Sequence, residues 1–282
     1  MIRTSRQLKA LVRNISCGNS EKARVIIRCY AMERFLERLS ISNYRNNLIL
    51  KGGFLISALV GINNRSTMDM DTTITSIPLT IDNAKEIVNK IINVKLDDGM
   101  TFTIKSIVPI MDEADYPGIR VILEAYLKKT RIPLKLDFSS GDVITPREIT
   151  YTYKLLFEER SIKILAYNLE TVLAEKFETI ISKGTANSRM RDFYDVYTLY
   201  NTFSSEINTN VLKTAIHNTS VQRGSSVVLQ EALLVVAEIE NSNEMIRLWE
   251  NYRKKFDYAS DVRWNDVISV LRELCFILLR LP

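Results

Sequence analysis

The sequence predicts an α+β protein in which a mixed-sheet core is followed by a helical C-terminal lobe. Two observations carry this prediction. Three strand-like runs with short connections follow one another, which favours antiparallel neighbours, at 101–110, 118–127 and 132–138. Residues 206–282 instead repeat apolar side chains at helical spacing. We therefore expect three parts: an N-terminal helical cap at 1–45, a core at 46–167 and a helical lobe at 168–282.

The elements follow from local pattern. Residues 5–16 and 21–39 read as helices separated at Gly18-Asn19, with Ser20 as the cap of the second. Residues 81–92 form an amphipathic helix. Two further strand candidates, 152–157 and 162–167, precede a helix that Asn168 caps and Gly184 ends. The next helix is expected at 187–199.

The most informative stretch runs from Lys51 to Asp71, KGGFLISALVGINNRSTMDMD. Gly52 and Gly53 open a short apolar helix, and a glycine-led helix N-terminus lets backbone N–H groups approach a phosphate. Asp69 and Asp71 are expected to lie on one face of a strand, because side chains two apart point the same way. Such a carboxylate pair suits Mg²⁺, which binds through one or two carboxylates plus substrate phosphates.

Further charged residues extend this pattern. Asp137 ends the third strand-like run and precedes Gly141-Asp142, so it is a candidate third carboxylate. Lys176 falls inside the apolar stripe of its helix, where it either reaches outward or meets an anion. We expect Asp192 to be that anion, with Asp195 as the alternative because sequence leaves the rotation of the helix open.

Composition limits the class of protein. The chain has 282 residues, a formal net charge of +5 that we read as spread along the chain, three cysteines without metal-ligand spacing and one histidine, His217. These values favour a cytoplasmic protein with reduced thiols and no His-rich zinc site. No apolar run is long enough to span a bilayer, so no membrane partner is expected. Basic and aromatic residues mix in 247–263, which fits either RNA contact or a solvated helix with core aromatics.

The set KGG, RSTMDMD, LDFSSGD and AEK…RMRDFYD resembles the motifs of the AbiEii nucleotidyltransferase toxins of abortive-infection systems, over about residues 45–200. The chain departs from the common pattern at Phe54, where Thr or Ala is usual, and Ser57 is the nearest alternative hydroxyl. The resemblance implies a polymerase-beta-like nucleotidyltransferase core. It implies a toxin, active in phage defence, that moves a nucleotide from an NTP to a cellular acceptor, with tRNA the best-known acceptor class.

The resemblance also implies roles for residues of this chain. Asp69, Asp71 and Asp137 would hold Mg²⁺, and Asp69, Asp71, Lys176 and Asp192 would be catalytic. The nucleotide would contact Gly52, Gly53, Ser57, Arg65, Thr67 and Lys176, with Lys51 and Asp195 as further candidates. The implied protein partner is a genetically paired antitoxin that acts as a transcriptional repressor without stable toxin contact.

Two other functions remain open at this stage. The same site could transfer a nucleotide or phosphate to a protein hydroxyl. A different class, a non-catalytic basic protein that binds nucleic acid, would keep its affinity without Mg²⁺ and would tolerate Asp69→Asn.

Overall fold

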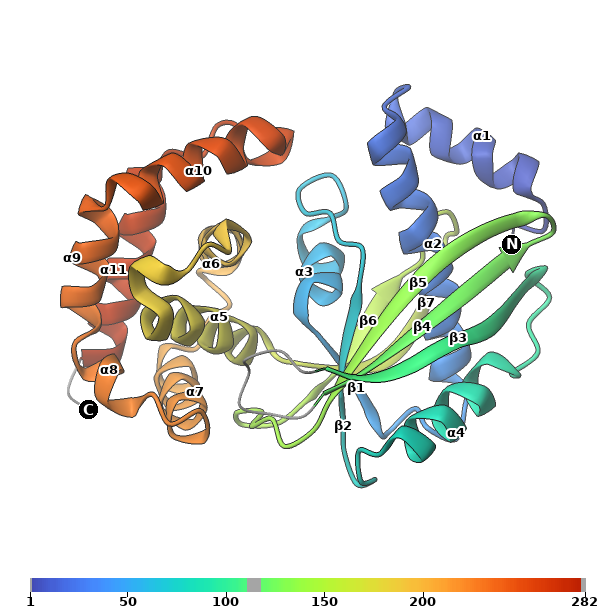
Figure 1. Ribbon diagram of the computed structural model, residues 1–282, viewed down its shortest axis with the longest axis horizontal. Coiled ribbons are helices and arrows are strands. Elements are labelled where there is room, and N and C mark those ends of the chain that lie inside the picture. Colours follow the sequence, from blue (N-terminus) through green and yellow to red (C-terminus); the bar gives the residue numbers. More distant parts are fainter. Residues whose placement is uncertain (1, 111–117, 280–282) are drawn as a thin grey trace. The chain divides into compact units, whose positions relative to one another are not determined.

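The computed structural model describes residues 2–110 and 118–279, which form two compact units (Figure 1). The first unit comprises the chain up to Gly141 together with Ile149–Ala166. The second comprises Asp142–Glu148 and the residues from Tyr167 onward. The expected loop at 112–117 lies outside the described residues.

The first unit contains a mixed sheet, as the sequence predicts. The described strands, in the order β3-β4-β5-β2-β1-β7-β6, are β3 (Met100–Ile110), β4 (Gly118–Leu127), β5 (Thr130–Ser139), β2 (Met70–Ile74), β1 (Leu48–Lys51), β7 (Ser161–Ala166) and β6 (Ile149–Lys154). The pairs β2–β5 and β1–β7 are parallel, and the remaining neighbours are antiparallel. The antiparallel run of β3, β4 and β5 confirms the prediction from their short connections.

Among the described residues, four helices accompany this sheet: α1 (Ser5–Ser16), α2 (Ser20–Ser40), α3 (Gly52–Val60) and α4 (Ile81–Ile92). The bounds of α1 and α4 are those that the periodicity predicts. The predicted cap of α2 is wrong by one residue, because the Asn19 side chain accepts hydrogen bonds from the N–H groups of Glu21 and Lys22. Asn19 is therefore the N-cap, and Ser20 is the first helical residue.

The described elements of the second unit are helical: α5 (Leu169–Lys183), η1 (Gly184–Ala186), α6 (Met190–Phe203), α7 (Thr209–Gln222), α8 (Ser226–Gln230), α9 (Ala232–Asn241), α10 (Asn243–Lys255), η2 (Asp257–Ala259) and α11 (Trp264–Leu279). The predicted cap of α5 is confirmed, since Asn168 accepts a hydrogen bond from the N–H of Thr171.

Aromatic side chains form the core of this second unit. Trp249 on α10 is fully buried and packs against Trp264 and Tyr252, with ring centroids 5.8 and 5.5 Å apart. The neighbouring arginines, Arg247, Arg253 and Arg263, form ion pairs with acids three residues away on the chain. The aromatic residues Trp249 and Tyr252 therefore lie in the core, whereas Arg247 and Arg263 stay on the surface.

Candidate active site

The turn between β1 and α3 is built around Gly52, whose φ of +65° lies in the left-handed region. Lys51, the residue before it, pairs with Asp71 across β1 and β2. A Cβ at position 52 would overlap the carboxylate of Asp71. Position 52 thus requires glycine for two reasons: its backbone is left-handed, and the carboxylate of Asp71 lies too close for a side chain. The sequence places a Gly-Gly turn and an acid 19 residues apart, and the fold brings them into contact.

Gly53, the next residue, lies against a buried wall. A Cβ there would be 3.1 Å from Nη2 of Arg65 and 3.1 Å from Oγ1 of Thr67. Arg65 is 1% exposed and donates to the carbonyl of Ser66, while Thr67 donates to the carbonyl of Asp69 at 3.3 Å. Arg65 and Thr67 therefore support the turn and the chain leading into the acid pair.

The acid pair straddles the start of β2. Asp71 lies within the strand, but Asp69 precedes Met70, the first strand residue. The prediction of a strand through both acids is therefore wrong at Asp69. Met70 is fully buried, whereas Asp69 keeps 39% of its side chain exposed. The buried methionine anchors the segment and leaves the Asp69 carboxylate accessible.

Asp137 on β5 is the register partner of Asp71 in the parallel pairing of β2 with β5. The third candidate carboxylate is thus adjacent to the first two. Its oxygens accept hydrogen bonds from Nε and Nη2 of Arg120 on β4, each at 2.9 Å. Nζ of Lys135 lies 3.0 Å from Oδ2 of Asp69 and 3.6 Å from Oδ2 of Asp137. Arg120 and Lys135 therefore place positive charge directly beside Asp69 and Asp137.

The donor set fits a hard divalent cation. Carboxylate oxygens are the ligands that Mg²⁺ prefers. Arg120 and Lys135 supply positive charge to the carboxylates of Asp69 and Asp137. Within residues 2–110 and 118–279, no three His, Cys, Asp or Glu side chains form a ready-made metal cluster. Asp69 and Asp71 would therefore bind a metal together with substrate phosphates, and Asp137 would join only by giving up contacts with Arg120 and Lys135.

The second unit holds the other charged candidates. Lys176 on α5 forms an ion pair with Oδ1 of Asp192 on α6, and its Nζ lies 3.5 Å from Oδ2 of Asp195. Both acids are essentially fully buried, at 1% and 0% exposure. Arg189 adds a second cation, with Nε 3.2 Å from Oδ2 of Asp192. The predicted Lys176–Asp192 contact is present, and Asp195 shares the lysine instead of replacing Asp192.

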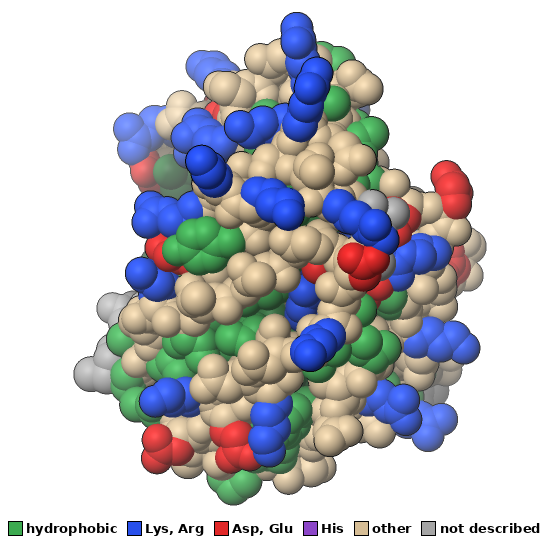
Figure 2. All heavy atoms as spheres, turned by 90° about the vertical axis from the view of Figure 1, so that its right-hand side faces the viewer, with side chains coloured by type: hydrophobic (Ala, Val, Ile, Leu, Met, Phe, Trp, Pro, Cys, Tyr) green, Lys and Arg blue, Asp and Glu red, His purple; other side chains and the backbone are tan. Residues whose placement is uncertain are grey.

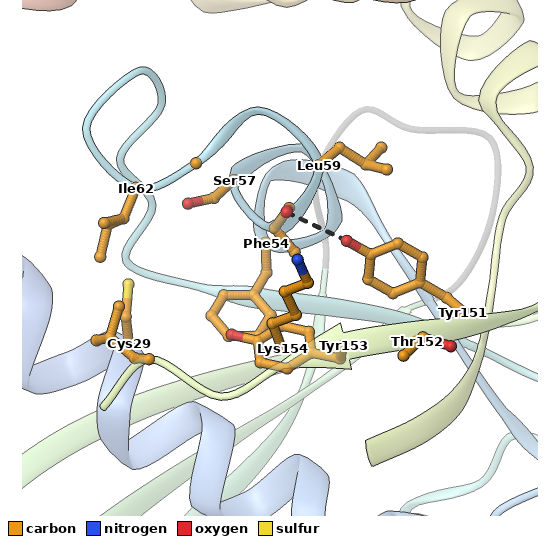
Figure 3. Close-up of a pocket in the computed structure, with 12 residues that line it drawn as sticks. Cys29, Phe54, Ser57, Leu59, Ile62, Tyr151, Thr152, Tyr153 and Lys154 are labelled. Atoms are coloured by element: carbon orange, nitrogen blue, oxygen red, sulfur yellow. Dashed lines mark hydrogen bonds between the residues drawn. The ribbon is translucent and has the colours of Figure 1, made fainter. Parts of the chain in front are cut away.

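Ser57 lies at the wall of a cavity of about 320 Å³ beside α3 (Figure 3). Phe54 and Tyr153 line the same cavity and stack with ring centroids 5.9 Å apart. Tyr151 closes it by donating to the carbonyl of Ala58 at 3.1 Å, and burial raises the pKa of its hydroxyl. Phe54 thus fills space between α3 and β6, which explains an apolar residue at a position where the related motif has Thr or Ala.

Sequence reasoning missed Arg120 and the tyrosines of β6. The alternation of Lys135 with Asp137 does indicate a shared face. Arg120, however, reaches Asp137 from another strand, and pairing between strands carries no local signal. His217, expected late in a helix, is exposed on α7. None of the described helices has the length and hydropathy that a bilayer crossing requires.

The glycine-led start of α3 is thus packed against Asp71 on a mixed sheet. The chain belongs to the family described as nucleotidyl transferase AbiEii toxin, type IV toxin–antitoxin system, whose family model matches residues 34–270. The resemblance read from the motifs is thereby confirmed. The family supports nucleotide transfer with an NTP as substrate, and it implies a paired antitoxin.

One solved structure, with a TM-score of 0.50, supports the fold, and two others are similar at lower scores. An H. pylori protein provisionally assigned as a nucleotidyltransferase has a TM-score of 0.50 at 14% identity, over 90% of this chain and 96% of that one. JHP933 from Helicobacter pylori has a TM-score of 0.49 at 16% identity, over 90% of this chain and 93% of that one. An antigenic nucleotidyltransferase-like protein from Paracoccidioides brasiliensis has a TM-score of 0.40 at 18% identity, over 80% of this chain and 94% of that one. No curated protein matches the chain at a significant level.

Proposed function

We propose that this protein is a toxin that transfers a nucleotide from an NTP to a cellular RNA, with tRNA as the acceptor, in phage defence by abortive infection. The observation that carries the proposal is the contact between the Gly52 turn and Asp71, with Asp69 two residues away. It supports the proposal because a glycine-led helix start can bind phosphate, and an acid pair beside it suits a metal.

In the proposed reaction the triphosphate lies at the N-terminus of α3, where the N–H groups of the Gly52–Gly53 turn can donate to it. An acceptor hydroxyl bonds to the α-phosphorus while the bond to the bridging oxygen breaks, pyrophosphate leaves, and the hydroxyl proton passes to solvent. Asp69 and Asp71 would hold Mg²⁺, and Asp137 would be a third ligand once it leaves Arg120 and Lys135. Bound there, the metal would neutralise phosphate charge and favour the attacking hydroxyl.

The supporting residues have narrower proposed roles. Arg65 and Thr67 support the Gly52–Gly53 turn by packing against Gly53. Lys51, the residue before this turn, is a further candidate for contact with the nucleotide. Lys176 neutralises negative charge that develops on the triphosphate, and Asp192 orients Lys176 with help from Asp195. Ser57, about 6 Å further along α3 than Gly53, would contact the nucleotide away from the phosphates that the turn binds.

The cellular setting is part of the proposal. An enzyme that consumes NTP and modifies tRNA acts in the cytoplasm. The paired antitoxin is proposed to act as a transcriptional repressor, without forming a stable complex with the toxin.

A labelling experiment tests the proposed function. The purified protein is incubated with each α-labelled NTP in turn, with Mg²⁺, total cellular RNA and total cellular protein. Label in tRNA-sized RNA supports the proposal. Label only in protein bands would replace the acceptor with a protein hydroxyl, and RNA binding without any labelling would indicate a non-catalytic binding protein.

A further inference from the structure

Positive charge is concentrated at the start of the chain. Residues 1–28 contain seven Lys or Arg residues and one acid, Glu21, whereas the whole chain has a formal net charge of only +5. The rest of the sequence is therefore close to neutral. The expectation that the charge is spread along the chain is wrong, and the basic character belongs to α1 and the first turns of α2.

Three of these cations form a stripe along α1. Arg6, Lys9 and Arg13 recur at intervals of three and four residues, so they lie on one side of the helix, and all three are exposed. The face that packs inward carries Leu8 and Val12, which are 1% and 2% exposed. Burial of the apolar face thus fixes the basic stripe on the surface.

Neighbouring segments extend the stripe. Arg24 on α2 is exposed, with Lys22 and Arg28 partly so. The turn between β4 and β5 carries exposed Lys128 and Lys129, and it adjoins α1 because Ser5 donates to the carbonyl of Leu127 at 2.6 Å. Figure 2 shows Lys and Arg side chains gathered over the upper part of this face, with few acids among them. We call the cations Arg6, Lys9, Arg13, Lys22, Arg24, Arg28, Lys128 and Lys129 the basic surface.

The basic surface lacks internal counter-charges. Within the described parts of the chain, no acidic side chain forms an ion pair with any of its eight members. Arg3 at its edge does pair, with Asp97. Like charges held together repel one another, and an external polyanion would relieve that repulsion.

We propose that the basic surface binds the phosphate backbone of the acceptor RNA and so brings the RNA to this enzyme. The inference rests on the proposed function for the identity of that RNA. Structured RNA is recognised largely through its shape and phosphates, which suits two packed helices that present arginine and lysine. A lipid surface fits less well, because insertion needs exposed apolar or aromatic anchors. Among described residues 2–28, the exposed large apolar side chain is Leu11, at 37%.

The test compares two triple variants of the full-length protein. Arg6→Ala, Lys9→Ala and Arg13→Ala together remove the α1 stripe. The matched control removes three exposed lysines elsewhere in the first unit, through Lys85→Ala, Lys154→Ala and Lys163→Ala. Both lose three positive charges, so the comparison separates the position of the charges from their number. Thermal melting checks that each variant is folded, which is expected because the changed side chains are exposed.

Binding is measured by fluorescence anisotropy with labelled unfractionated tRNA, in the absence of NTP so that no transfer occurs. The stripe variant should bind about tenfold or more weakly, and the slope of log Kobs against log salt should become shallower by about two to three, because each lost phosphate contact removes about 0.9. The control should retain both the slope and at least about half of the affinity. Equal effects in the two variants, or none in the stripe variant, would overturn the proposal.

Two further readouts separate this inference from the proposed function. If transfer to RNA occurs, the stripe variant should raise KM for RNA with kcat unchanged. Transfer to RNA with an unchanged KM for RNA would refute the proposed RNA binding by the basic surface. The proposed function would still stand. Sedimentation with phosphatidylglycerol vesicles is the second readout. Vesicle binding that depends on the stripe, without tRNA binding, would assign the surface to a membrane instead.

Discussion

The carboxylate of Asp71 occupies the space that a side chain at Gly52 would need, so the proposed phosphate-binding turn and the acid pair form one packed unit. The register of β1 with β2 produces this contact by pairing Lys51 with Asp71. Any side chain at position 52 would displace the carboxylate of Asp71. The relationship explains why the two short motifs must occur together.

Replacing Gly52 with alanine should abolish nucleotide transfer and lower the stability of the fold. The φ of +65° costs a residue with a Cβ about 1–2 kcal/mol, and the overlap with Asp71 adds to that cost. Gly18→Ala is the matched control, because Gly18 has a φ of +83° but open space around its Cβ position. The difference between the Tm losses of the two variants measures the cost of the overlap with Asp71. Equal destabilisation of the two would mean that Asp71 simply moves aside.

Arg120 is expected to compete with a divalent cation for Asp137. Arg120→Gln releases both Asp137 oxygens from the guanidinium, which lies 2.9 Å from each. Mn²⁺ binding, measured by isothermal titration calorimetry, should tighten roughly fivefold, the equivalent of about 1 kcal/mol for a partly exposed pair. Arg131→Gln, which disturbs an ion pair with Glu124 further along the same strands, should leave Mn²⁺ affinity unchanged. Weaker binding in Arg120→Gln would show that the guanidinium orients Asp137 for the metal.

Lys176 should matter to folding as well as to transfer. Its loss removes a cation from the buried Asp192 and Asp195, while Arg189 still contacts Asp192. A buried acid deprived of its cation is costly, so Lys176→Ala should lower the free energy of unfolding by about 2–4 kcal/mol. The sequence alone favours a much smaller folding cost, because it does not show that both acids are buried.

The double variant Lys176→Ala with Asp192→Ala should be little worse in transfer than the worse single variant, because coupled residues are not additive. Lys176→Arg keeps the charge and should restore stability more than activity. Urea unfolding and transfer rates at saturating nucleotide provide both measurements. Fully additive losses in transfer would show that the two residues act separately.

Stability should fall with rising pH through Glu33, which is 1% exposed on α2. Burial raises the pKa of this carboxyl to about 7 from 4.5, although Arg34 opposes the shift. The folded state therefore holds a proton that the unfolded state releases between pH 4.5 and 7, and the associated stability of about 3 kcal/mol is lost over that range. Wild type should lose more stability than Glu33→Gln between pH 5 and 8 in urea titrations. Parallel pH profiles would show that Glu33 stays ionised throughout.

Local signals in the sequence predict much of this architecture. The helix at 81–92, the Asn168 cap and the strand that contains Asp137 follow from periodicity, capping side chains and turns. Asp69 falls outside its predicted strand because alternation cannot show where a strand begins. The pairing of Asp71 with Asp137 and the reach of Arg120 join residues far apart in sequence, so they depend on strand order, which no local pattern encodes.

The acid pair is the central claim, and one assay tests it most directly. Wild type, Asp69→Asn, Asp71→Asn and the exposed control Asp82→Asn are incubated with α-labelled NTP, Mg²⁺ and total RNA, after melting curves confirm that each is folded. We expect Asp82→Asn to label RNA like wild type. Asp69→Asn and Asp71→Asn should each lose at least about 10²–10³-fold in rate. Wild-type labelling by either variant would contradict the assignment of these carboxylates to nucleotide transfer.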